Sequence, residues 1–98
     1  MTDINDLRAV WPLAWQPHDD GYWFVPVGGG VIQVTLAGSR SAVWFDGGFG
    51  AQVIGRGDIR TSVRQACGWL RARENILLQE AGDIAAAVAA VDISRQTG

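Results

Sequence analysis

The sequence of 98 residues contains no lysine, a single cysteine and a single histidine. One cysteine excludes an intramolecular disulfide and favours a reducing compartment. A metal centre needs three or four converging ligands, and one histidine, His18, offers little toward such a site. The longest apolar run, Ile84 to Val91, is too short to span a bilayer. We therefore expect no metal, no cofactor and no membrane association.

Neither sign of charge predominates in the sequence. Eight arginines stand against ten acidic residues, and the formal net charge is -2. Such a chain has no overall field that would attract nucleic acid or a membrane surface. The polar and acidic residues 1–6 are unlike a secretory signal, so we expect a cytoplasmic protein.

Glycine and tryptophan are abundant, with 13 and 5 residues respectively. Hydrophobic residues make up 48% of the chain and charged residues 18%. This is the composition of a globular protein, and the length predicts one domain over residues 1–98.

The first half of the chain predicts a helix followed by a sheet. Apolar residues at helical spacing predict a short helix over residues 3–11, which Pro12 ends. Turn-forming residues predict irregular chain over 12–21. Aromatic and β-branched runs separated by glycine-rich turns then predict an antiparallel meander. The predicted strands cover residues 22–27, 31–37, 41–45 and, as a fourth, 49–54.

The second half predicts helix, because apolar residues recur every seven positions from Val63 to Val91. Asp58 is one candidate N-cap, and Ser62 with Gln65 forms an alternative capping box. Gly82 and Asp83 interrupt the pattern, so the C-terminal region forms one helix or two.

An antiparallel meander has a face to cover, and the helices are the elements that can cover it. We therefore expect an α+β fold. It consists of an N-terminal helix, a three- to four-stranded antiparallel meander, and a C-terminal helix or helix pair packed on one sheet face.

Few residues offer catalytic chemistry. His18, Asp19 and Asp20 are consecutive in a predicted turn, where carboxylates are usually just solvated. Cys67 would need a neighbouring base to form a thiolate. It lies on the apolar side of a predicted helix and is more simply a small core residue. We expect that the protein is not an enzyme, and an enzyme using these four residues is the alternative.

Arginines gather at the start of the predicted C-terminal helix. Arg60, Arg64 and Arg71 fall close together on a helical wheel, beside the apolar stripe. Arg56 would extend this row if the helix started early. Such a row could bind phosphates or an acidic protein surface. The alternative is a solvated face that keeps the protein soluble.

The aromatic residues form a second candidate surface. Neighbours along a strand point to opposite faces, so Tyr22 and Phe24 oppose Trp23, and Trp44 opposes Phe45. Large aromatics therefore lie on both faces of the sheet. The helices must cover the second face, or it remains an exposed apolar patch of the kind that marks interfaces. The alternative is that the tryptophans all pack in the core and at the helix–sheet seam.

The order of one helix, three strands and a second helix over residues 3 to about 80 resembles the double-stranded-RNA-binding domain. That family places a lysine cluster at the start of its second helix. This chain has no lysine, and Arg60 and Arg64 are the nearest substitutes. The resemblance is one of element order only.

The residues favour a non-enzymatic protein-binding module, a small adaptor or inhibitor. A phage-encoded inhibitor of a host complex such as a CRISPR effector is one form of this hypothesis. A homodimer that shares the helical stripe or a sheet edge is another. The alternative is a nucleic-acid-binding domain that uses the arginine-rich helix face. The predicted partner-binding residues are Arg56, Arg60, Arg64, Arg71, Trp15, Trp23 and Trp44.

Overall fold

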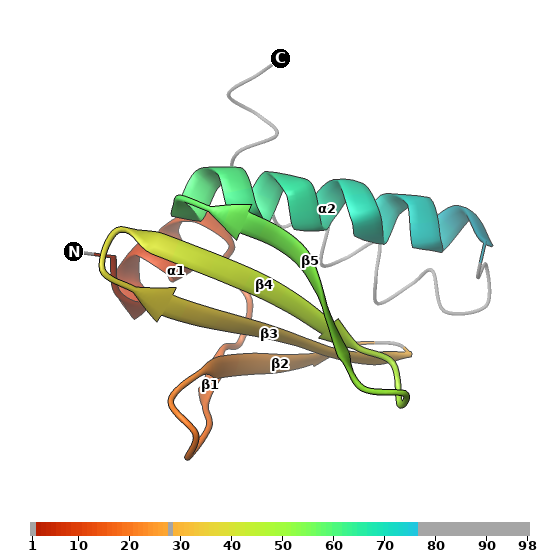
Figure 1. Cartoon of the computed structure of the whole chain (residues 1–98), viewed down its shortest axis with the longest axis horizontal. Helices are drawn as coiled ribbons and strands as arrows, with labels where there is room; N and C mark the ends of the chain where they lie inside the picture. The colour runs from red at the N-terminus through yellow and green to blue at the C-terminus, as the bar shows by residue number, and fades with distance from the viewer. Residues whose placement is uncertain (1, 28, 77–98) are drawn as a thin grey trace.

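The computed structural model describes residues 2–27 and 29–76. The predicted last helix, and the choice between one and two C-terminal helices, lie outside these residues. The elements follow one another along the chain with short connections (Figure 1). They are α1 (Ile4–Val10), β1 (Gln16–Pro17), β2 (Trp23–Val27), β3 (Gly30–Ala37), β4 (Arg40–Asp46), β5 (Ala51–Gly57) and α2 (Ile59–Ile76).

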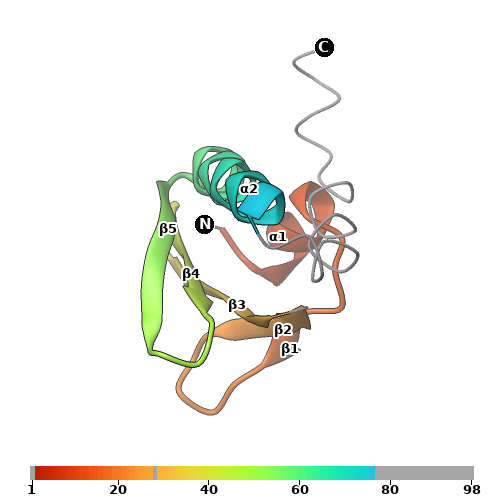
Figure 2. The ribbon, with the colours of Figure 1, turned by 90° about the vertical axis from the view of Figure 1, so that its right-hand side faces the viewer.

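The strands form one antiparallel sheet in the order β1-β2-β3-β4-β5, and the α+β class is confirmed. The sheet is curved, and both helices lie on its concave side (Figure 2). Helix α2 contacts β5 and β4, and it also contacts α1. The opposite, convex side of the sheet faces away from both helices.

The sheet has five strands within the described ranges, where three to four were expected. The additional strand, β1, lies in the segment predicted to be irregular. Its two residues pair with β2, Gln16 with Phe24 and Pro17 with Trp23. A strand this short has no alternation of its own, so only the pairing with β2 defines it.

The last strand also differs from the prediction, because β5 continues through Gly55 to Gly57. The pairing of β4 with β5 shifts register between Val43 and Trp44. Val43 pairs with Gly55 and Trp44 pairs with Val53, so Ile54 is the extra residue of a β-bulge. The bulge interrupts the alternation by which a strand is recognised in a sequence.

Helix α1 begins with a capping box. The Asp3 carboxylate accepts hydrogen bonds from the backbone N–H groups of Asn5 and Asp6, and the Asp6 carboxylate accepts one from the Asp3 N–H at 2.9 Å. These bonds satisfy backbone donors that a helix start otherwise leaves unpaired. Leu7 and Val10 of this helix are buried in the core.

The core lies between the concave side of the sheet and the two helices. On β3 the alternation predicted from the sequence is visible, with Ile32 and Val34 fully buried and Val31 and Gln33 only half-buried. The largest fully buried side chains include Trp11, Phe45, Leu7, Ile32 and Leu70.

Helix α2 approaches β5 so closely that a side chain would not fit between them. A Cβ atom on Gly55 would collide with the backbone carbonyl oxygen of Ser62. Beside this contact, the buried hydroxyl groups of Ser41 on β4 and Ser62 on α2 are hydrogen-bonded at 2.6 Å. The Gln65 side-chain oxygen accepts the backbone N–H of Arg56 at 3.0 Å. Three contacts therefore seat the first half of α2 on the sheet.

We predict opposite effects of alanine at two glycines. Gly55→Ala forces α2 away from β5 and should lower the free energy of unfolding by about 1–3 kcal/mol, as overpacked cores do. Gly68 lies in α2, where an added methyl group would meet no atom within 4 Å beyond the backbone of its own helical turns. Gly68→Ala should raise the free energy of unfolding by about 0.5–1 kcal/mol through helix propensity. Urea unfolding followed by tryptophan fluorescence measures both, and equal effects at the two sites would contradict the close approach.

Candidate binding face

The convex side of the sheet, here named the outer face, carries a row of large side chains. Phe24, Gln33, Trp44 and Val53 are consecutive cross-strand partners on β2, β3, β4 and β5. All four are half-buried rather than enclosed. Neither α1 nor α2 lies on this side (Figure 2), so among the described elements none covers this aromatic and apolar row.

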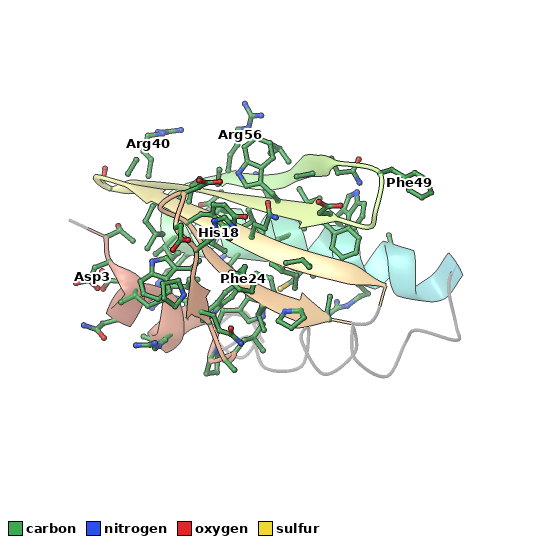
Figure 3. The ribbon with its side chains drawn as sticks, turned by 90° about the horizontal axis from the view of Figure 1, so that it is seen from below. Asp3, His18, Phe24, Arg40, Phe49 and Arg56 are labelled. Carbon is green, nitrogen blue, oxygen red and sulfur yellow. The ribbon has the colours of Figure 1, made fainter. Side chains whose placement is uncertain are left out.

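A groove of about 360 Å³ lies on the outer face beside this row. The indole of Trp44 and the side chain of Val53 line one part of it, and two arginines, Arg40 and Arg56, line another. Figure 3 shows Arg40 and Arg56 extending outward at the side of the sheet where β4 begins and β5 ends. The lining residues are Thr35, Ala37, Arg40, Ser41, Ala42, Trp44, Val53, Arg56 and Gly57.

The sheet register explains why these two arginines are neighbours. Arg56 pairs with Ala42 on β4, and Arg40 lies two residues before Ala42 on the same strand. Residues two apart point to the same face, so both guanidinium groups rise on the outer face. Both side chains are exposed. Within the described part of the chain, neither forms an ion pair, and no acidic residue lines the groove.

Two tryptophans predicted as binding residues differ in how their indole N–H groups are satisfied. The Trp15 N–H donates to the backbone oxygen of Trp11 at 2.7 Å, and the Trp15 ring packs edge-on against the Trp11 ring. The Trp44 N–H is buried and has no acceptor among the described residues. Unpaired buried donors are uncommon in folded proteins. The indole N–H of Trp15 is therefore satisfied within the fold, whereas that of Trp44 has no acceptor among the described residues.

The loop between β1 and β2 adds a second group of aromatic rings. The His18 ring stacks on Tyr22 at 4.3 Å between centroids and meets the edge of Phe24 at 6.0 Å. Backbone hydrogen bonds from His18 to Tyr22 and from Gly21 to His18 hold the loop. This hairpin projects from the sheet on the side away from α2 (Figure 1). The stack thus extends the outer face beyond Phe24.

The predicted residues Trp15 and Trp23 belong to the helix-covered side. Trp15 is only 4% exposed and is part of the core. Trp23 packs against the core at its margin, and the Arg8 guanidinium carbon lies 5.9 Å from the centre of its ring. Trp44 is thus the one predicted binding tryptophan on the outer face.

The predicted arginines divide between two elements. Arg60, Arg64 and Arg71 are exposed on α2, as their helical spacing predicts. Arg56 does not extend their row, because the chain at residue 56 is still strand and α2 begins at Ile59. Its side chain belongs to the outer face instead.

Sequence reasoning missed Arg40. Because Arg40 follows Gly38 and Ser39, the sequence predicts it as part of a turn, yet it is the first residue of β4. Alternation from Trp44 through Ala42 would have placed Arg40 on the same face, had the strand been extended by one residue.

The residues of the enzyme hypothesis are not brought together. Cys67 is buried on the side of α2 that meets the concave face of the sheet. His18 stands on the other side of the sheet (Figure 3). Its Nδ1 atom accepts the backbone N–H of Asp20 at 3.0 Å and lies 3.7 Å from the Asp20 carboxylate. These contacts organise the turn itself.

Comparison with protein-family models, with curated proteins and with solved structures finds no significant match. The resemblance to the double-stranded-RNA-binding domain therefore stays one of element order, and the five-stranded sheet departs from the three strands of that order. No helix in the described ranges is long and apolar enough to cross a membrane.

We predict that Cys67 is inert in the folded protein. Burial raises the pKa of its thiol to about 12, although the charge of Arg71 acts in the opposite direction. The thiol thus stays protonated near neutral pH, and only the thiolate attacks disulfide reagents. Ellman's reagent should react slowly with native protein and rapidly in urea, and Cys67→Ser should abolish the signal. Rapid reaction in the native state would contradict this burial.

Asp58 gives a prediction for pH dependence. Its carboxylate accepts the backbone N–H of Thr61 at 2.8 Å at the start of α2, and this bond lowers the pKa of Asp58 below its ordinary value. The ionised form therefore stabilises the fold above the unfolded-state pKa, and this stability is lost as the pH falls through the folded-state pKa. Asp58→Asn should lower the thermal midpoint at neutral pH, and the difference from the parent should shrink in acid. A difference that is constant with pH would contradict the assignment.

Proposed function

We propose that this chain is a non-enzymatic protein-binding module, of the adaptor or inhibitor kind, that contacts its partner through the outer face of its sheet. The observation that carries the proposal is the half-buried row of Phe24, Gln33, Trp44 and Val53, left uncovered by both helices and flanked by an open groove.

The composition of the outer face supports this function. Protein interfaces are enriched in aromatic residues and arginine, and tryptophan and arginine are frequent among the residues that dominate binding energy. The groove combines Trp44, Arg40 and Arg56 over a floor of small side chains.

The arginines of α2 are weaker candidates for the same role. Arg60, Arg64 and Arg71 are exposed on a helix whose apolar residues Val63, Ala66 and Leu70 are already buried in the core. Charge without adjoining apolar surface is typical of a solubilising face.

A nucleic-acid-binding function is the second candidate. Aromatic side chains beside arginines on an open sheet are also the means by which proteins bind single strands, through base stacking and phosphate contacts. That function predicts affinity that falls steeply with salt concentration. The net charge of -2 weighs against it.

The two arginine groups provide matched variants for a test. We expect the tagged protein to capture a stoichiometric protein partner from a lysate of its source cells, with or without nuclease. The outer-face variant Arg40→Glu/Arg56→Glu should lose this partner. The variant Arg64→Glu/Arg71→Glu makes the same change of charge on α2 and should retain it. Mass spectrometry of the captured material measures each outcome.

The opposite pattern, loss only with the α2 variant, would assign binding to the helix face and contradict the proposal. Recovery of nucleic acid that disappears after nuclease treatment, with no protein partner, would favour the second candidate. Circular dichroism of both variants establishes that each keeps the fold.

A further inference from the structure

The groove is hollow because short side chains interrupt the outer face. Along β4, Ala42 separates the large ring of Trp44 from Arg40, and its cross-strand partners are Thr35 and Arg56. Ala37 and Gly57 continue the low floor. The small Ala42 side chain beside the large Trp44 ring leaves the groove, with Trp44 on one side and the arginines at its edge.

The charged groups of the groove are all of one sign. Arg40 and Arg56 are both exposed, and no carboxylate among the side chains that the structure describes pairs with either. The lining also contains the Thr35 hydroxyl but no acidic side chain. Guanidinium groups bind carboxylates and phosphates through paired, charge-assisted hydrogen bonds. The complement of this groove is therefore an anion joined to something apolar.

The surroundings of the groove favour a few carboxylates over a continuous polyanion. Asp46 lies two residues beyond Trp44 on β4, on the same face by alternation. Asp19 and Asp20 are exposed in the β1–β2 loop, which projects on this side. A nucleic-acid strand that crosses the face would carry phosphates toward these carboxylates. A short peptide can place its acidic side chains over the two arginines alone.

We propose that this groove binds a short acidic segment of a partner protein. An Asp or Glu side chain of the segment pairs with Arg40 and Arg56, and a neighbouring apolar side chain rests on Ala42 against the Trp44 ring. This inference rests on the proposed function and adds to it the chemistry of the partner.

Selection from a library of random short peptides displayed on phage tests the proposal without presuming a sequence. The full chain is the bait, and Arg64→Glu/Arg71→Glu is the charge-matched control. We expect both to select peptides rich in Asp or Glu next to an apolar residue. Arg40→Glu/Arg56→Glu should select none of these. Arg40→Gln/Arg56→Gln, which adds no negative charge, should bind the selected peptides roughly tenfold or more weakly.

A synthetic copy of a selected peptide then measures the role of charge. Replacing its Asp or Glu residues with Asn or Gln should weaken fluorescence-anisotropy binding roughly tenfold or more. Added salt should weaken the binding of the acidic peptide and leave the binding of the neutral peptide nearly unchanged.

Several results would overturn the inference. They are selected peptides without acidic enrichment, selection that survives Arg40→Gln/Arg56→Gln, or no selection at all. If a single-stranded oligothymidylate binds more tightly than the acidic peptides, the groove is a nucleic-acid-binding site instead. If sedimentation shows a dimer that only the outer-face variant loses, the groove is an interface with a second copy of the chain instead. If the lysate partner still depends on Arg40 and Arg56 while acidic peptides fail, the inference falls and the proposed function stands.

Discussion

The direct contact of α2 with β5 at Gly55 is the constraint on which the rest of the structure depends. Because no side chain intervenes, the helix backbone rests against the strand, and the Ser41–Ser62 hydrogen bond and the Gln65 side chain hold it there. This seating brings Val63, Ala66 and Leu70 into the core. It also commits the helix to the concave side of the sheet, so neither described helix covers the other side.

The bulge in β5 links this core contact to the outer face. Ile54 and Gly55 are adjacent and both are buried, so the strand gives two successive residues to the helix side. After the bulge the alternation resumes in a new phase, and Arg56 pairs with Ala42, two residues from Arg40 on the same face. Without the extra residue, the side chain of residue 56 would point to the core. One local irregularity thus allows close helix packing and places the second arginine of the groove.

The sequence predicted much of this fold but only part of the candidate site. Helix α1, strands β2 to β4 and the start of α2 follow from apolar periodicity, turn residues and the Asp58 cap. The two-residue β1 and the bulge at Ile54 arise from pairing with other strands, and local pattern does not contain such information. Strand pairing also determines where β4 begins and β5 ends. For this reason Arg56 was wrongly predicted to extend the helix row and Arg40 was wrongly assigned to a turn. Trp44 was predicted, but Trp15 and Trp23 could be told from it only by knowing which face the helices cover.

Both edges of the described sheet carry features that hinder the addition of another strand. At one edge, the Gln65 side chain occupies the outward backbone N–H of Arg56, and α2 lies along β5. At the other, β1 is two residues long and one of them, Pro17, has no N–H to donate. Exposed strand edges are where sheet proteins aggregate edge to edge. The described sheet is therefore a poor template for a further strand from a neighbouring molecule, and edge-to-edge growth of the native sheet is disfavoured.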